Sequence, residues 1–315
     1  MLNKIRKNPQ TGGRPSAAVE ISSEGVLAAA RPAAAKRGAT EPREAYVYAF
    51  VPFPAGALVP RFEEPGMEQP NLRKPDVVAA AIRSALDEVS PRTRDVTLVL
   101  PDTLVRVFVL DFDSLPAKPA EAISVVRFRL RKTVPFDVEH AGVSYQVLTA
   151  SKTERKVLAA VMPGPILAEY EAAVRAAGYE PGAVLPSSLA ALEAADTMGA
   201  VLAANLSAMA MTTAIANGQD LLLYRTLDLP EDPGQRVAEI QRSIAVAAAY
   251  YEDKLGVRPR QLHYAGIQKA AEFAKSIGDP ELTVVEWTPH PEHGATTGLP
   301  QTSFAGVAGA LAGAS

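Results

Sequence analysis

The sequence predicts an α/β fold in which one unit of three strands, a helix and a fourth strand occurs twice. Short apolar runs come in groups of three, and each group is followed by a stretch of helical spacing and another apolar run. The 315 residues exceed what one hydrophobic core usually holds, which favours two lobes. A compact block of alternating strands and helices separates the two units, and this indicates an inserted α+β subdomain.

The composition is that of a globular protein and excludes several functions. Hydrophobic residues make up 48% of the chain and charged residues 21%, so a wholly disordered chain is excluded. The formal net charge of −3 provides no basic surface for nucleic acid, and we expect no nucleic-acid partner. The chain has no cysteine, which excludes disulfides, zinc-thiolate sites and thiol catalysis. Because we find neither a membrane-spanning run nor a signal peptide, we expect a cytoplasmic protein.

We divide the chain into a tail and three parts. The tail is basic and rich in glycine, and it is either solvated or in weak contact with anionic lipid. The boundaries are 1–15 for the flexible basic tail, 16–103 for the first subdomain, 104–178 for the inserted subdomain, and 179–315 for the second subdomain, whose C-terminal helix returns to pack.

In the first unit, two apolar runs flank a turn and predict a hairpin, and the third strand is rich in aromatic and β-branched residues. The helix has a proline in its first turn, and the strand after it is almost wholly apolar, as in strands buried on both faces. The expected elements are strands at 17–21, 26–30 and 45–51, a helix at 76–89 and a strand at 96–100.

The inserted block has its own pattern. Its second helix is followed by Gly178, a residue type that commonly ends helices in the left-handed conformation. The expected elements are a strand at 104–110, a helix at 119–132, strands at 143–148 and 157–162, and a helix at 166–177.

The second unit repeats the order of the first. Asn217-Gly218 is a strong hairpin signal, while Asp232 and Gly256 suit the two ends of a long helix. The expected elements are strands at 201–206, 209–216, 220–227, 261–265 and 282–287, and helices at 233–255, 268–277 and 303–314.

Three segments of the inserted block and its borders resemble a known family. They are residues 100–116 (LPDTLVRVFVLDFDSLP), 126–137 (VRFRLRKTVPFD) and 143–147 (VSYQV). They resemble the type IV pilus assembly protein M (PilM) family, with the cytoplasmic part of type II secretion L proteins as a more distant relation. Shorter segments at 170–171, 177–182, 186–189, 222–226, 239–243 and 250–253 add to the resemblance.

The resemblance implies an actin-like fold built from duplicated RNase H-like units. It also implies a cytoplasmic scaffold for pilus biogenesis and twitching motility, held at the inner membrane by its partner. That partner would be a single-span, PilN-like protein whose cytoplasmic N-terminal peptide is bound, and pilus motor ATPases are further expected partners.

In ATP-binding proteins of this fold the first hairpin reads Asp-x-Gly-x-x-x-x-Lys, because phosphate must approach bare backbone and an acid organises the water around Mg²⁺. Here Glu20, Ser22 and Leu27 stand at these three positions. The second hairpin has Asn205 and Ser207 in place of Asp and Gly, and the adenosine turn keeps one glycine. We expect either no cofactor or weakly bound ATP with Mg²⁺, at Glu20, Ser22, Ser23, Asn205, Ser207 and Gly266.

The expected partner site lies on the inserted block. Arg127 and Arg131 are four residues apart and share one helical face, which is either solvated or an anchor for an acidic or carbonyl-rich peptide. Pro135 and Phe136 follow, either as buried core or as the wall of a groove. An extended peptide would then dock on residues 104–178, or between them and the first lobe.

Three functions therefore remain in competition. A scaffold is favoured by the degenerate hairpins, and an ATPase that closes its lobes on hydrolysis is the alternative. A secretion L protein is disfavoured, since such proteins continue into a membrane span. No catalytic residue is assigned, and we expect no metal site, because His290 and His293 have no evident further ligand.

Overall fold

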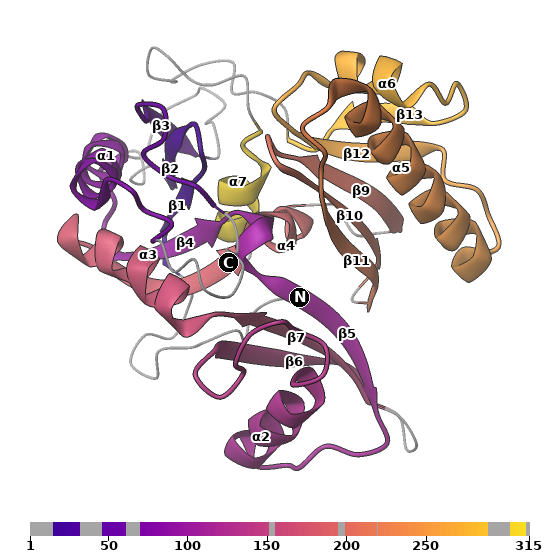
Figure 1. Cartoon of the computed structure of the whole chain (residues 1–315), viewed down its shortest axis with the longest axis horizontal. Coiled ribbons are helices and arrows are strands. Elements are labelled where there is room, and N and C mark those ends of the chain that lie inside the picture. The colour runs from indigo at the N-terminus through magenta and orange to yellow at the C-terminus, as the bar shows by residue number, and fades with distance from the viewer. Residues whose placement is uncertain are drawn as a thin grey trace, which may run out of the picture. The chain divides into compact units, whose positions relative to one another are not determined.

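The computed structural model in Figure 1 describes most of the chain, in seven segments. The chain divides into two compact units, and each is taken here by itself. The described segments are residues 15–31, 46–60, 70–150, 155–194, 199–218, 220–288 and 303–312. One unit contains Asp102–Leu167 and Ala195–Trp287; the other contains Arg6–Pro101, Ala168–Ala194 and Thr288–Ser315.

The unit that contains residues Arg6–Pro101 is built on a five-stranded sheet of order β3-β2-β1-β4-β8, called here the first sheet. Strand β1 runs antiparallel to β2 and parallel to β4, which is buried along nearly its whole length, as an apolar central strand requires. The strands are β1 (Ala17–Ile21), β2 (Gly25–Ala30), β3 (Val47–Pro52), β4 (Asp95–Leu100) and β8 (Glu180–Pro186). The helices are α1 (Pro75–Val89), α3 (Gly164–Ala176, continuing from the other unit), α4 (Ser187–Leu192) and α7 (Ala305–Ala312).

Helix α7 consists almost wholly of small and apolar residues because it is buried between a sheet and another helix. It lies against β1, β2 and β4 and beside α4, and Val307 and Leu311 are fully buried. At Gly309 the two helix backbones approach so closely that a Cβ atom would overlap the carbonyl oxygen of Ala190. The small residues are therefore required by helix–helix packing.

The other unit contains a second five-stranded sheet of equivalent order, β11-β10-β9-β12-β13. Helix α5 covers it, and its N-terminus is capped by Asp232, which accepts a hydrogen bond from the backbone N–H of Gln235 at 2.8 Å. Gly256 ends this helix with φ of +71°, as predicted. The elements are β9 (Ala200–Leu206), β10 (Ala210–Asn217), β11 (Asp220–Asp228), α5 (Pro233–Leu255), β12 (Gln261–Gly266), α6 (Ala270–Ile277) and β13 (Thr283–Glu286).

The two sheets confirm the predicted duplication. In each sheet, three antiparallel strands are followed by a helix and by a fourth strand that pairs in parallel with the first. The hairpin predicted at Asn217-Gly218 is present, with Gly218 at φ of +58° between paired strands.

The inserted module belongs to the same unit as the second sheet. A three-stranded antiparallel sheet of order β5-β7-β6 is covered on one face by α2, through Val126 and Leu130. Strand β5 also lies beside β11. The elements are the short 3-10 helix η1 (Asp102–Leu104), β5 (Arg106–Phe112), α2 (Pro119–Leu130), β6 (Gly142–Ala150) and β7 (Arg155–Met162).

The structure corrects the boundary at residue 179. Strand β8 belongs to the sheet that contains β1, and helix α4 belongs to the same unit, not to the second subdomain of residues 179–315. Neither element was predicted. Pro181, Gly182 and Pro186 resemble loop residues, yet β8 is an edge strand, where proline is tolerated. The strand expected from residue 104 begins at Arg106, because Asp102–Leu104 form η1.

None of the helices in the described part of the chain has both the length and the apolarity that crossing a membrane requires.

Candidate nucleotide and partner sites

The first candidate site is the turn between β1 and β2, which is closed by its own side chains. The backbone N–H of Ser22 donates to the carbonyl of Gly25 at 2.9 Å, and the Ser22 hydroxyl donates to the same carbonyl at 3.3 Å. That hydroxyl also accepts from the N–H of Glu24 at 3.3 Å, while Ser23 donates to the Glu24 carboxylate at 2.8 Å. Both candidate serines are thus engaged within the turn.

The turn between β9 and β10 has the same hydrogen bonds. The N–H and the hydroxyl of Ser207 both donate to the carbonyl of Ala210, at 2.9 and 3.0 Å. The hydroxyl accepts from the N–H groups of Met209, at 3.3 Å, and Ala210, at 2.9 Å. In addition, Arg236 of α5 donates to the carbonyls of Ala208 and Ser207, at 2.8 and 3.0 Å.

The shared pattern has a chemical consequence. A serine at the first position of a turn uses its hydroxyl to satisfy N–H groups further along the turn. The N–H groups of Glu24, Met209 and Ala210, which belong to the two turns that bind phosphate in ATP-binding proteins of this fold, therefore already have an acceptor. A phosphate oxygen would have to compete with that acceptor at each turn.

Glu20, which stands where these ATP-binding proteins have an aspartate, is half-buried on β1. Its carboxylate accepts a hydrogen bond of 2.6 Å from the hydroxyl of Ser187, at the start of α4. The same carboxylate lies directly against Gly306 of α7, where a Cβ atom would overlap it. The acid is thus held by the protein's own helices.

Asn205 lies near the end of β9 and belongs to a hydrogen-bond network around Asp102. Asp102 is buried, with only 8% of its surface exposed. The Asp102 carboxylate accepts from the hydroxyls of Thr212, at 3.0 Å, and Tyr224, at 2.8 Å, and from the side-chain amide of Asn205, at 3.4 Å. Three donors from β9, β10 and β11 thereby tie the second sheet to η1. Asp102 was not predicted as a site residue. In the sequence it stands out only as an acidic residue that follows an apolar strand and a proline.

Gly266 ends β12 beside β9. A Cβ atom there would lie 2.7 Å from the carbonyl oxygen of Leu206 and 2.5 Å from the hydroxyl of Tyr264. Close packing of the two strands therefore requires this glycine. Asn205, Ser207 and Gly266 gather at the ends of neighbouring strands, while Glu20, Ser22 and Ser23 belong to the other unit.

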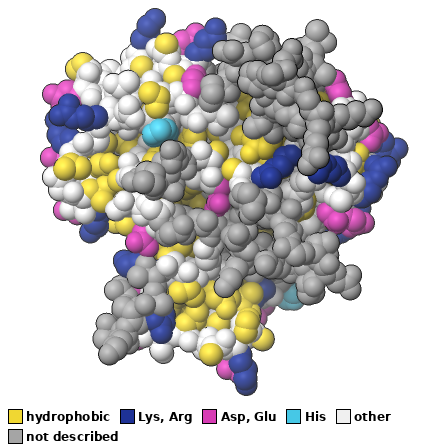
Figure 2. Space-filling view, turned by 180° about the vertical axis from the view of Figure 1, so that it is seen from behind, with side chains coloured by type: hydrophobic (Ala, Val, Ile, Leu, Met, Phe, Trp, Pro, Cys, Tyr) yellow, Lys and Arg dark blue, Asp and Glu magenta, His cyan; other side chains and the backbone are white. Residues whose placement is uncertain are grey.

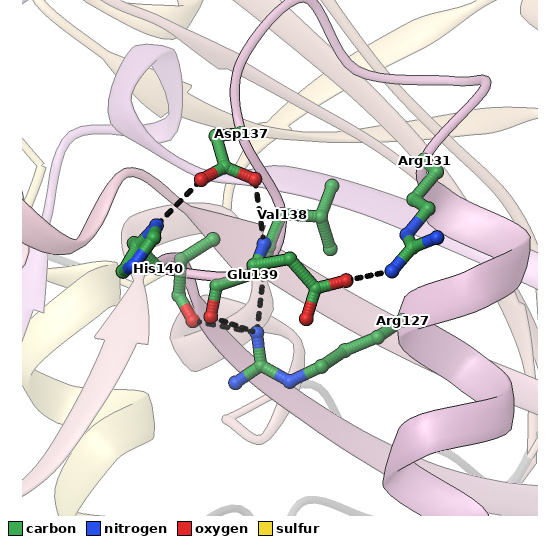
Figure 3. Close-up of polar contacts among 7 residues, drawn as sticks. Arg127, Arg131, Asp137, Val138, Glu139 and His140 are labelled. Atoms are coloured by element: carbon green, nitrogen blue, oxygen red, sulfur yellow. Dashed lines mark hydrogen bonds and ion pairs between the residues drawn. The ribbon is translucent and has the colours of Figure 1, made fainter.

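Arg127 on α2 holds the loop that follows the helix (Figure 3). Its guanidinium donates to the carbonyls of Val138, Glu139 and Ala141, at 3.4 Å to Glu139 and 3.0 Å to Ala141. The expected anchor for carbonyl groups is therefore occupied by carbonyls of the protein itself.

Ion pairs and hydrogen bonds of Arg131, Asp137, Glu139 and His140 hold the rest of this loop. Arg131 pairs with the carboxylate of Glu139, and both side chains are more than half exposed. Asp137 accepts from the N–H of Glu139 at 2.9 Å and contacts His140 at 2.5 Å. The hydrogen bond from His140, and then that from Glu139, lowers the pKa of the Asp137 carboxyl.

Pro135 and Phe136 lie at the tip of the same loop. Pro135 is exposed, whereas Phe136 is half-buried against the core formed by α2 and the module's sheet. Figure 2 shows hydrophobic side chains gathered on the face of the inserted module that this view presents. His290 and His293 lie outside the described residues.

Comparison with solved structures identifies several of similar fold. One is described as a PilM-PilN type IV pilus biogenesis complex, and the matching chain in it is 16% identical to this one. The match covers 87% of this chain and 88% of that chain, with a TM-score of 0.61. The cytoplasmic domain of EpsL, an inner-membrane component of the type II secretion system of Vibrio cholerae, is 14% identical over 94% and 92% of the chains, with a TM-score of 0.48. A Bacteroides thetaiotaomicron protein with an actin-like ATPase fold and unknown function is 10% identical over 89% and 94%, with a TM-score of 0.44.

No protein-family model matches the chain, and no curated protein matches it. The likeness to the first of these structures and the two sheets of equivalent order show that the chain has an actin-like α/β fold.

Proposed function

We propose that the chain is a cytoplasmic scaffold of a type IV pilus assembly machine, which binds the cytoplasmic N-terminal segment of a PilN-like inner-membrane protein. The observation that carries this proposal is the likeness, over 87% of the chain, to a protein of a PilM-PilN complex. The resemblance of residues 100–116, 126–137 and 143–147 to the PilM family agrees with it. Pilus motor ATPases are further partners under this proposal.

The partner segment docks on the inserted module as an added strand. Strand β6 lies at an edge of the module's sheet, so one row of its backbone groups faces away from β7. An extended peptide pairs with such an edge through its main chain and gains specificity from alternate side chains. Val147 of this strand is 39% exposed, which leaves apolar surface for those side chains.

In this arrangement the loop after α2 forms a wall beside the start of β6. Pro135 and Phe136 contact the peptide, while Arg131 lies on the exposed side of the loop. Arg127 acts as a positioning residue, since it fixes the carbonyls of Val138 and Ala141 just before β6 begins.

A degenerate nucleotide site completes the proposal. The serine-closed turns and the engaged Glu20 carboxylate favour weak or no binding of ATP with Mg²⁺ over the ATPase alternative. The Glu20 carboxylate is engaged by Ser187 and lies against Gly306, so this acid is poorly placed to organise Mg²⁺ and its waters.

Peptide binding tests the scaffold. The N-terminal cytoplasmic segment of the PilN-like protein from the same source, made as a synthetic peptide, should bind the full chain in isothermal titration, and a scrambled peptide should not. Two further peptides carry N-methyl groups on the odd-numbered or on the even-numbered residues. One of them should lose binding and the other should keep it, because only every second N–H group of an added strand pairs with β6. Equal binding of both methylated peptides would exclude strand addition, and absence of any binding would exclude the proposed partner.

A further inference from the structure

The end of α2 exposes an aromatic side chain that the proposed function does not use. Phe128 is 70% exposed, more than any other large hydrophobic residue that the structure describes. Its neighbours Val126 and Leu130 are fully buried against the module's sheet, so Phe128 points away from that core. Leaving this ring in water costs free energy, but one exposed hydrophobic residue is common in proteins, so the charges around the ring decide what the surface can bind.

Cationic side chains surround Phe128. Arg129, Arg131 and Lys132 are exposed, and the Arg131 guanidinium lies 5.9 Å from the centre of the Phe128 ring. Arg131 also pairs with Glu139, but within the described segments neither Arg129 nor Lys132 has an ion pair.

The acidic side chains of α2 and of the loop after it, Glu121, Asp137 and Glu139, each have a partner. Glu121 is bound by Lys118 at 3.0 Å, about two turns before Phe128 on the same helix. In the loop, Asp137 contacts His140 and Glu139 contacts Arg131. The surface of Phe128, Arg129, Arg131 and Lys132, called here the α2 surface, is therefore locally cationic in a chain of net charge −3.

We propose that the α2 surface docks on an anionic lipid bilayer. Arginine and lysine are attracted to anionic headgroups, while an aromatic ring inserts at the level where headgroups meet acyl chains. This inference rests on the proposed function, which places the protein beside the inner membrane through its partner.

A lipid surface fits these residues better than a protein groove does. Aromatic hot spots in protein interfaces are surrounded by contacts that exclude water. Around Phe128 the exposed positions one turn away, Ser124, Arg131 and Lys132, are polar or charged. A single ring among cations on a convex helix suits a headgroup layer, which supplies both charge and apolar depth.

Docking of this kind would orient the inserted module at the membrane. The same module carries β6, so the surface that meets lipid and the edge proposed to receive the partner peptide share one hydrophobic core. Two weak attachments on one element raise each other's occupancy through effective concentration.

Vesicle flotation of the full chain, without partner or peptide, tests the proposal. Binding to phosphatidylcholine vesicles that contain phosphatidylglycerol should exceed binding to pure phosphatidylcholine and fall as salt increases. The double variant Arg129→Glu/Lys132→Glu should bind at least about tenfold more weakly, since each cation near the surface is worth roughly fivefold. The control Arg242→Glu/Lys254→Glu makes the same charge change at exposed positions of α5 and should bind like the parent.

A fluorescent probe separates insertion from general attraction. The chain has one tryptophan, Trp287, which is 7% exposed. In Phe128→Trp, brominated anionic lipids should quench the added emission and leave that of Trp287 unchanged. Arg129→Glu/Lys132→Glu and Phe128→Trp should unfold at the same temperature as the parent, because the altered side chains are exposed.

Several results would overturn the proposal. These are equal flotation with and without phosphatidylglycerol, equal losses in both double variants, or no quenching of Trp at position 128. Loss of peptide binding in Arg129→Glu/Lys132→Glu with unchanged flotation would reassign the α2 surface to a protein partner. Peptide titration uses no lipid, so failure of the proposed function and failure of lipid docking are distinguishable.

Discussion

At the scale of single residues, one serine starts the turn between β1 and β2 and another starts the turn between β9 and β10. Each serine determines how the backbone of its turn is hydrogen-bonded. Ser22 and Ser207 make equivalent bonds in two units of different surroundings. The duplication therefore extends from the order of strands to individual hydroxyl groups. In both turns the hydroxyl occupies N–H groups that an open glycine turn would present to a ligand.

Removing these hydroxyls should cost stability. Ser207→Ala deprives the N–H groups of Met209 and Ala210 of their acceptor, and we expect a loss of about 0.5–1 kcal/mol in the free energy of unfolding. Ser22→Ala removes two long hydrogen bonds of 3.3 Å, only one of which satisfies a backbone N–H, and should cost less. Urea unfolding measures both, with Ser124→Ala on exposed α2 as a neutral control. Equal effects at all three serines would show that the turns gain nothing from their hydroxyls.

Arg127 and Arg131 should behave differently although they share a helical face. Arg127→Ala leaves three carbonyl groups without their charged donor, and we expect a loss of about 1.5–3 kcal/mol in urea unfolding. Arg131→Ala breaks an exposed ion pair worth about 0–1 kcal/mol. Arg127→Lys should restore only part of the loss, because one ammonium group cannot reproduce the planar fork. Similar losses for both alanine variants would contradict the assigned role of Arg127.

His263 on β12 should make stability depend on pH. Burial between β9 and β13 lowers its pKa below the usual 6.5, so the folded state favours the neutral ring. The unfolded chain then binds more protons near that pH, and the contribution of this residue is full above pH 6.5 and is lost as pH falls through the folded pKa. Unfolding free energy measured from about pH 5 to 8 should fall less steeply on acidification in His263→Val than in the parent. His263→Gln, a second uncharged substitution, should show the same reduced slope, and a slope equal to that of the parent in both variants would contradict the assigned role of His263.

At the scale of elements, the packing of α7 on α4 depends on backbone contact. Gly309→Ala places a methyl group against the carbonyl of Ala190, which is backbone and cannot rotate away. We expect a loss of about 1–3 kcal/mol in urea unfolding, even though alanine favours helix more than glycine does. Gly199→Ala, where a Cβ meets nothing within 4 Å, should be neutral. A neutral Gly309→Ala would mean that the two helices separate easily.

Elements also show how far sequence patterns extend. Each of the three-strand groups was predicted, as were α1, α2 and α5, because apolar spacing and turn residues act over a few positions. Strand β8 was missed, because Pro181 and Gly182 oppose a strand locally. Pairing with β4 outweighs that preference. The pairing joins residues far apart in the chain, and no local pattern reveals it.

At the scale of the whole molecule, an actin-like fold without open phosphate turns should respond weakly to ATP. Isothermal titration with ATP and Mg²⁺ should give either no heat or a dissociation constant near the millimolar range, where ligand adds little to stability. The turns would have to break their own hydrogen bonds to bind more tightly. A low-micromolar constant, or steady phosphate release, would favour the ATPase alternative.

Local sequence was enough to predict the repeated unit, the hairpin at Asn217-Gly218 and the ends of α5, since turn chemistry and capping depend on residues within one or two turns. The tertiary structure alone decided which groups the candidate residues meet. Glu20 is held by Ser187, Asn205 joins the Asp102 network, and Arg127 binds its own loop. These partners come from separate elements, and only the packing of those elements brings a donor within reach of its acceptor.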